Sequence, residues 1–145
     1  MSSTAEIAVI DREDLAWFLA DPGGTIDRRG QDFPDPYPWS GIAARTVLTL
    51  LDAHGIDLDP GPLPKVVSIA ARDDIIRVLV PAHRRHLDAL HPDEFTDREI
   101  TRAFEHWHAD TERLAAVPAA HDTVTRIRAL LARIADDQVG VIWIT

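Results

Sequence analysis

Cysteine is absent from the sequence. Disulfide bonds and thiolate metal sites are therefore excluded, and the lack of cysteine agrees with a reducing compartment. The first residues carry neither the basic nor the apolar region of a secretory signal, and no apolar run approaches the roughly 18 residues that a membrane helix needs. We therefore expect a cytoplasmic protein that does not enter a membrane.

Lysine is nearly absent as well, since Lys65 is the only one and arginine supplies the other basic side chains. The 24 acidic residues outnumber the 15 basic residues and give a formal net charge of -9. Binding to a phosphate backbone depends on basic side chains that displace counterions. We therefore expect no binding to nucleic acid, and we expect the partner to be another protein or a second copy of the chain.

The common catalytic signatures are also missing. The sequence holds no Gly-x-Ser-x-Gly, no phosphate-binding loop and no dinucleotide fingerprint. No cofactor can be identified from it.

What the sequence does contain is a strong helical pattern from Thr96 to Asp136. Thr96 and Glu99 have the spacing of a capping box, in which each side chain bonds to the backbone N–H of the other residue. Two apolar stripes follow at steps of about three and four residues, as on one face of a helix. They are Ile100, Phe104, Trp107, Thr111 and Leu114, and then Ala120, Val124, Ile127, Leu131 and Ile134. Because Pro118 separates the stripes and Asp122 is a candidate cap, the pattern predicts a helical hairpin.

Two other segments are read as helices. Ser40 is a typical N-cap, and Gly55 is a typical left-handed terminator, so residues 41–54 are predicted to form a helix between them. A shorter helix is expected over residues 12–19, which begin with acidic residues and carry apolar residues at helical spacing.

Two further segments are rich in branched apolar residues. Residues 68–91 favour a helix broken at Pro81, although residues 65–70 and 75–80 also fit a β-hairpin. The apolar tail, residues 139–145, favours an extended strand that pairs with residues 6–10 or with a partner chain.

Residues 21–39 contain three glycines and four prolines, so we expect a long loop without regular structure. Its second half alternates prolines with Phe33, Tyr37 and Trp39, and the prolines should stiffen it. Long loops of this kind often cover or form binding sites, although such aromatics can equally fill gaps on a helical surface. We take these three residues, together with Trp143 of the tail, as candidate binding residues.

Histidine and glutamate suggest a second kind of site. His83 and His86 are one helical turn apart, as are Glu105 and His108. Folding the chain about residues 92–95 sets Glu105 level with His83, so that the four side chains become candidate metal ligands. Without a metal, His83 and Glu105 are the candidate catalytic acid and base. The competing interpretation is that these residues are solvated or structural, because Glu105 and His108 flank an apolar stripe.

The sequence as a whole predicts an all-α fold. We expect a single helical domain over residues 1–145, an irregular bundle of four to six helices with a short terminal β-strand in addition. The predicted function is a small protein-binding or regulatory module. The alternative is a small enzyme that acts on a small polar substrate, with or without a metal, at the His/Glu site.

Overall fold

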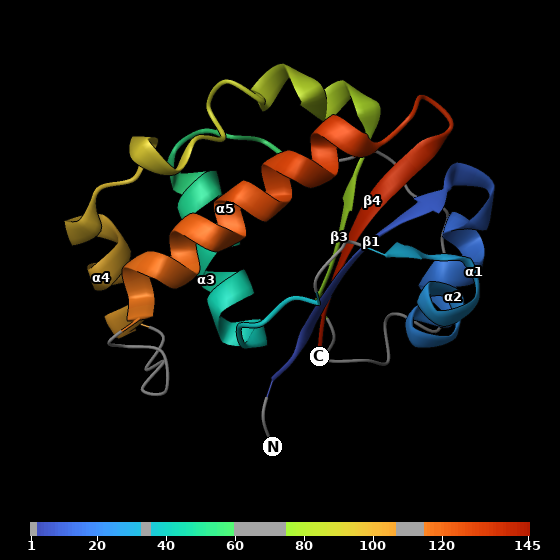
Figure 1. The fold of residues 1–145 in the computed structure, drawn as a ribbon, viewed down its shortest axis with the longest axis horizontal. Helices are drawn as coiled ribbons and strands as arrows, with labels where there is room; N and C mark the ends of the chain where they lie inside the picture. The colour runs from blue at the N-terminus through green and yellow to red at the C-terminus, as the bar shows by residue number, and fades with distance from the viewer. Residues whose placement is uncertain (1–2, 33–35, 60–74, 107–114) are drawn as a thin grey trace.

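Figure 1 shows the computed structural model of the chain, which describes residues 3–32, 36–59, 75–106 and 115–145. An antiparallel β-sheet runs through its centre, with helices on both sides. The predicted all-α fold is therefore wrong, and the chain has a mixed α/β structure.

The sheet has four strands in the order β2-β1-β4-β3, and each neighbouring pair is antiparallel. The strands are β1 (Ala5–Asp11), β2 (Gln31–Asp32), β3 (Ile75–Leu79) and β4 (Gln138–Ile144). β4 pairs with β1 over its whole length and with β3 on its other side. The prediction that the apolar tail pairs with residues 6–10 is thus confirmed.

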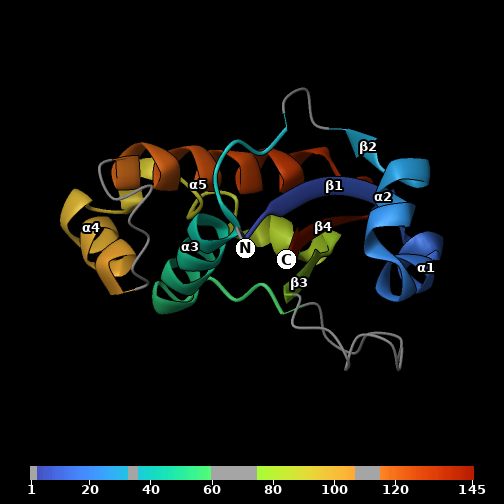
Figure 2. The same cartoon turned by 90° about the horizontal axis from the view of Figure 1, so that it is seen from below.

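Helices form the two outer layers of the structure. They are η1 (Arg12–Asp14), α1 (Leu15–Ala20), α2 (Pro22–Arg29), α3 (Gly41–Ala53), η3 (Pro81–His86), η4 (Pro92–Glu94), α4 (Asp97–His106) and α5 (Ala116–Arg133). Figures 1 and 2 place α3, α4 and α5 on one side of the sheet and α1 and α2 on the other. Among the described residues, no helix is long and apolar enough to cross a bilayer.

The core has two parts because successive residues of a strand point to opposite faces of the sheet. The larger part joins Val9 and Ile142 of the sheet to α3, α4 and α5. The smaller part joins Ile10 and Val141 to α1, where Phe18 is fully buried. A strand that is buried on both faces reads as a continuous apolar run, as in β4, rather than as an alternating pattern.

The helix predicted over residues 68–91 is not formed in its described part. Ile75–Leu79 is a strand that pairs with β4. Branched side chains favour a sheet, and the edge of β4 that does not pair with β1 is available for this strand. The predicted hairpin partner, residues 65–70, lies outside the described residues. Pro81 begins the 3-10 helix η3 instead of interrupting an α-helix.

The segment 21–39, predicted as a long loop, holds the helix α2 and the short strand β2. The side chain of Asp21 accepts a hydrogen bond from the Gly24 backbone N–H at 3.3 Å and caps α2. Pro22 occupies the start of the helix, where its missing N–H leaves no bond unmade. The Pro-Gly-Gly sequence therefore begins a helix that we expected it to prevent.

The two helices of the predicted C-terminal hairpin are present. The capping box is confirmed, because Glu99 accepts from the Thr96 N–H at 2.7 Å and Thr96 Oγ1 accepts from the Glu99 N–H at 3.2 Å. α5 begins at Ala116, so the prediction that Pro118 precedes the second helix is wrong. A proline in the first turn interrupts no helical hydrogen bond. Trp107, Thr111 and Leu114 of the first stripe lie outside the described residues.

The helix α3 agrees closely with its prediction. Ser40 Oγ accepts a hydrogen bond from the Ala43 N–H at 3.2 Å, and Gly55 has a φ of 74°, in the left-handed region. Both ends of α3 are therefore set by the residues that the sequence identified.

Candidate functional site

The aromatic residues predicted to bind a partner mainly contact this chain itself. The Tyr37 hydroxyl lies 2.9 Å from Thr123 Oγ1, and the Trp39 indole N–H donates to Asp122 Oδ2 at 2.8 Å. Asp122, predicted to cap a helix, instead joins α5 to the segment that precedes α3. Both aromatic rings also pack against the larger core. Phe33 lies outside the described residues.

Trp143 of β4 is half-buried against the other helical layer. A Cβ atom added to Gly23 of α2 would lie 3.3 Å from the indole of Trp143. The indole also packs against the smaller core. Trp143 therefore packs between α2 and the sheet, and most of the surface of its side chain is unavailable to a partner.

His83, predicted to be catalytic or a metal ligand, is only 1% exposed. Its Nδ1 accepts a hydrogen bond from the Val80 N–H at 3.0 Å, and its Nε2 lies 2.9 Å from the Asp59 carbonyl oxygen. A carbonyl oxygen accepts only, so Nε2 carries the proton and the imidazole is neutral. Both nitrogens are thus bonded to the backbone, which leaves neither for a metal or a substrate in this arrangement.

The other predicted members of that site are not brought together with His83. Figures 1 and 2 place η3, which carries His83 and His86, near the C-terminal end of α5 and place α4, which carries Glu105, near its N-terminal end. His108 lies outside the described residues. Within the described part of the chain, no three His, Asp or Glu side chains are grouped so as to hold a metal ion.

A different histidine and glutamate do meet. His54, at the end of α3, lies 2.8 Å from Glu99 Oε2 through its Nε2, and its ring centre lies 4.4 Å from that of Phe95. Burial raises the pKa of Glu99, but the hydrogen bonds from His54 and the Thr96 N–H outweigh burial and lower this pKa below its ordinary value. The pair joins the end of α3 to the start of α4.

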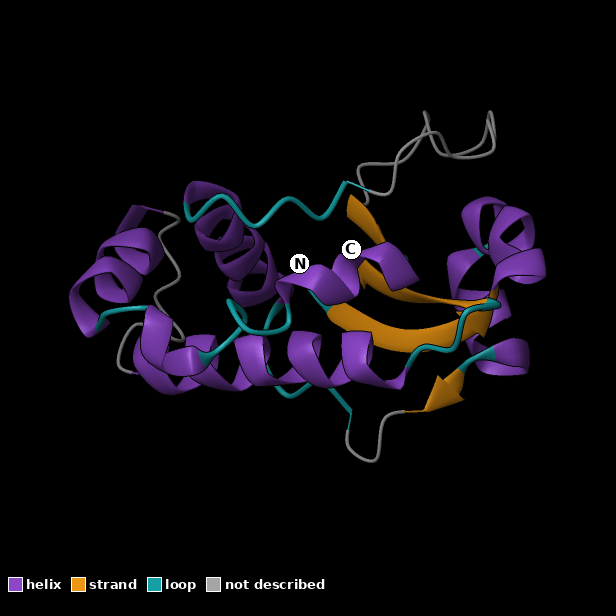
Figure 3. Ribbon diagram, turned by 90° about the horizontal axis from the view of Figure 1, so that it is seen from above, coloured by secondary structure: helices purple, strands orange, loops and turns teal. Residues whose placement is uncertain are grey.

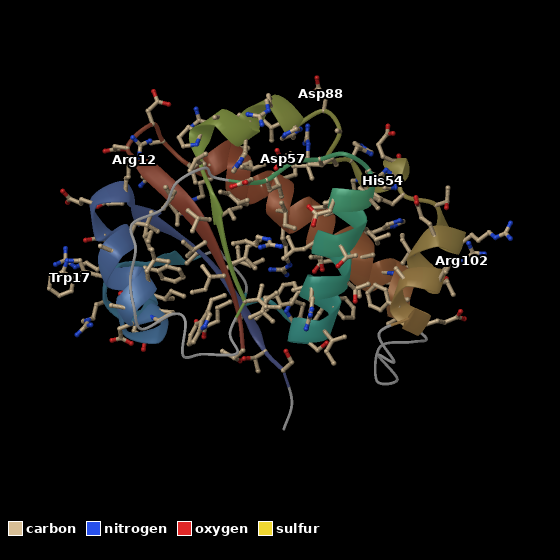
Figure 4. All side chains as sticks on the ribbon, turned by 180° about the vertical axis from the view of Figure 1, so that it is seen from behind. Arg12, Trp17, His54, Asp57, Asp88 and Arg102 are labelled. Atoms are coloured by element: carbon tan, nitrogen blue, oxygen red, sulfur yellow. The ribbon has the colours of Figure 1, made fainter. Side chains whose placement is uncertain are left out.

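Trp17 of α1 is the most unusual surface residue. It is 72% exposed, and no other described side chain is a large exposed hydrophobic group. Figure 4 shows Trp17 directed away from the body of the protein. The sequence held a signal for this: with Leu15, Phe18 and Leu19 inward, residue 17 falls on the opposite face of the helix. We identified the helix but not the exposed tryptophan on it.

A hollow of about 180 Å³ lies beside Trp17, between α1 and α2. Its lining combines the apolar surface of Trp17 with polar side chains and charges of both signs. The lining residues are Asp14, Trp17, Thr25, Arg28 and Arg29. Thr25 is buried, whereas Arg28 and Arg29 are exposed at the surface. We refer to these five residues as the Trp17 hollow.

Asp14 is the buried acidic group of the Trp17 hollow, with 9% of its surface exposed. It holds the N-cap position of α1, but its side chain makes no capping hydrogen bond. The reason is its backbone: Asp14 is the last residue of η1, so it has helical angles, φ -87° and ψ -2°, in place of the extended angles of a capping residue. Its carboxylate is therefore not used in capping, and Asp14 lines the hollow.

No protein-family model, curated protein or solved structure matches the chain. Its function must therefore be inferred from the geometry and chemistry of its own residues.

Proposed function

We propose that the chain is a small acidic protein-binding module and that its partner docks on the surface formed by α1 and α2. The observation that carries this proposal is the exposure of Trp17 beside a hollow that charged side chains help to line. Tryptophan and arginine are the residue types most enriched among those that dominate protein–protein binding energy, and here Trp17 stands next to Arg28 and Arg29. A partner that covers the indole would recover the burial energy that the free chain forgoes.

Charge supports a basic partner. The formal net charge of the chain is -9, and the segment from Asp11 to Arg29 holds five acidic and three basic side chains. Opposite charge on the partner would speed its encounter with this chain. Two copies of this acidic chain would instead repel each other. We therefore place another, basic protein ahead of self-association.

The alternative of a small enzyme has less support. Its proposed acid or base, His83, bonds to the backbone through both nitrogens, and α4 carries Glu105 at the other end of α5. An interaction function needs neither group.

The test compares the wild-type chain with Trp17→Ala and with Arg98→Ala, an exposed residue of α4 on the other side of the sheet. Proteins retained from an extract of the source organism by the wild type are identified and purified, and binary affinity is measured by calorimetry. We expect Trp17→Ala to weaken binding by about 2 kcal/mol, or about thirtyfold, as truncation of a central interface residue does. Arg98→Ala should leave the affinity unchanged.

Two results would overturn the proposal. One is equal affinity of the wild type and Trp17→Ala for the purified partner. The other is the failure of the wild type to retain any protein that the Trp17→Ala chain does not retain equally.

A further inference from the structure

The carboxylate of Asp14 has no partner in the described structure. No described group donates a hydrogen bond to it or pairs with it, although the residue is nine-tenths buried. Its oxygens are nevertheless not among the fully buried side-chain atoms that lack a hydrogen bond, so the carboxylate is reached by solvent and can be reached by a ligand. The position of Asp14 in the Trp17 hollow, open to a partner, points to a positively charged ligand group.

The nearby arginines do not supply that positive charge. Arg28 pairs with Asp21 at 3.6 Å, and its Nε donates to the Gly24 carbonyl oxygen at 3.1 Å. Arg12 donates to the Asp136 carbonyl oxygen at 2.7 Å. Arg29 lines the hollow, but it is exposed, and water screens its charge. Within the described ranges, then, no basic side chain pairs with Asp14, and we look for its positive partner on a binding protein.

The other lining residues favour a guanidinium group. An indole attracts a cation over its face, and arginine stacks on aromatic rings more often than lysine does. A guanidinium also bonds to a carboxylate through two parallel N–H groups. The hollow has a volume of about 180 Å³. That space suits one extended side chain and excludes a folded element.

We infer that the Trp17 hollow receives one arginine side chain of the basic partner, with Asp14 as its counter-ion and Trp17 stacked on its guanidinium. The inference rests on the proposed function, because it assigns the chemistry of the partner at the same surface. The Thr25 hydroxyl adds a hydrogen-bond acceptor to the site. Arg28 and Arg29 then face the backbone carbonyl groups that flank the bound arginine, to which they can donate.

The experiment uses the full chain and three capped tripeptides, Gly-Arg-Gly, Gly-Lys-Gly and Gly-citrulline-Gly. Citrulline has nearly the shape of arginine but carries no charge. Binding is followed by the NMR signal of the Trp17 indole N–H, which is assigned by its loss in Trp17→Ala. We expect the arginine peptide to shift this signal, the lysine peptide to bind more weakly, and the citrulline peptide to bind at least about tenfold more weakly than arginine.

Two variants test the role of Asp14. Asp14→Asn should weaken binding of the arginine peptide by about tenfold or more, since a charged partner is lost. Asp27→Asn is the matched control, because Asp27 is an exposed carboxylate of α2 that does not line the hollow. It should leave binding unchanged. If Asp14→Asn does not fold, the comparison of arginine with citrulline on the wild-type chain still decides the result.

The inference is overturned if the arginine peptide leaves the Trp17 signal unshifted, or if arginine and citrulline bind alike. It is also overturned if a folded Asp14→Asn chain binds arginine as the wild type does. If the peptide tests fail but Trp17→Ala still weakens binding of the protein partner, the proposed function stands and the hollow binds a group of different chemistry. Arginine binding without any effect of Trp17→Ala on the partner would support the site and reject the proposed docking surface.

Discussion

At the scale of single residues, Glu99 connects local structure to the response of the protein to pH. One of its oxygens accepts from the Thr96 N–H and the other from His54. Both contacts favour the charged carboxylate, which is why its pKa lies below the ordinary value of 4.5. A carboxyl group with a lowered pKa in the folded state adds stability above its ordinary pKa, and this stability is lost as pH falls through the lowered value.

The corresponding prediction compares the stability of Glu99→Gln with that of the wild type. At neutral pH the variant should be less stable by about 0.5 to 1 kcal/mol, a value for a pair whose side chains are about one-third exposed. The difference in stability should shrink as pH falls below the ordinary pKa of a glutamate, because the wild-type carboxyl group then becomes neutral too. Urea melts at several pH values measure it. A difference that stays constant with pH would contradict this account.

His83 shows the limit of residue-level inference from sequence. Its spacing from His86 suggested a metal site, but the sequence gives no sign that the Val80 N–H and the Asp59 carbonyl oxygen would meet its two nitrogens. Those partners depend on the path of the backbone on either side of β3. Trp17 is the opposite case, because helical periodicity was enough to put it on the exposed face, although we did not draw that conclusion from the sequence.

At the scale of elements, the segments predicted correctly carry their own end signals. Ser40 and Gly55 bound α3, and Thr96 and Glu99 start α4. β3 has no such signal: branched residues over 75–79 fit a buried helix or a buried strand equally well until β4 supplies a partner. α2 was missed because proline and glycine stop a helix in its interior but start one at its first turn.

The contact between β4 and α5 yields a prediction at this scale. Gly140 lies under α5, and an added Cβ atom would lie 2.7 Å from Cγ of Leu130, which is fully buried. The branch point of a packed leucine cannot move aside without displacing the helix. Gly140→Ala should therefore lower the free energy of unfolding by about 1 to 3 kcal/mol.

The control for this prediction is the double variant Gly140→Ala with Leu130→Ala. Because the shorter side chain at 130 removes the clash, the cost of Gly140→Ala should largely vanish in the Leu130→Ala background, which a double-mutant cycle measures. Equal costs in both backgrounds would show that the two residues do not interact.

At the scale of the whole molecule, the two helical layers have different roles. α3, α4 and α5 bury the larger core, whereas α1 and α2 cover the smaller core and carry the Trp17 hollow on their outer surface. Figure 3 shows the sheet between these layers. The strands that open and close the described chain, β1 and β4, lie side by side in the sheet. Pairing between segments so distant in sequence was predicted only because both were short and apolar.

The position of β4 makes the C-terminal segment indispensable to the fold. β4 lies between β1 and β3, so a chain shortened after Gly140 loses four of the seven residue pairs with β1 and four of the five with β3. It also loses Ile142 and Ile144 from the larger core and Val141 from the smaller one. Each large apolar side chain contributes roughly 1.5 to 3 kcal/mol when buried, and the whole stability of a domain is about 5 to 15 kcal/mol.

We therefore expect the chain shortened after Gly140 to show no cooperative thermal transition and no near-ultraviolet circular dichroism. Removal of Thr145 alone is the matched control, because Thr145 is exposed and lies beyond the last residue of β4. That shorter deletion costs only local hydrogen bonds with Ser3 and Thr4, and it should keep a cooperative transition within a few degrees of the wild type. A cooperative transition in the chain that ends at Gly140 would mean that β1 and β3 do not depend on the strand between them, and the sheet described here would then be wrong.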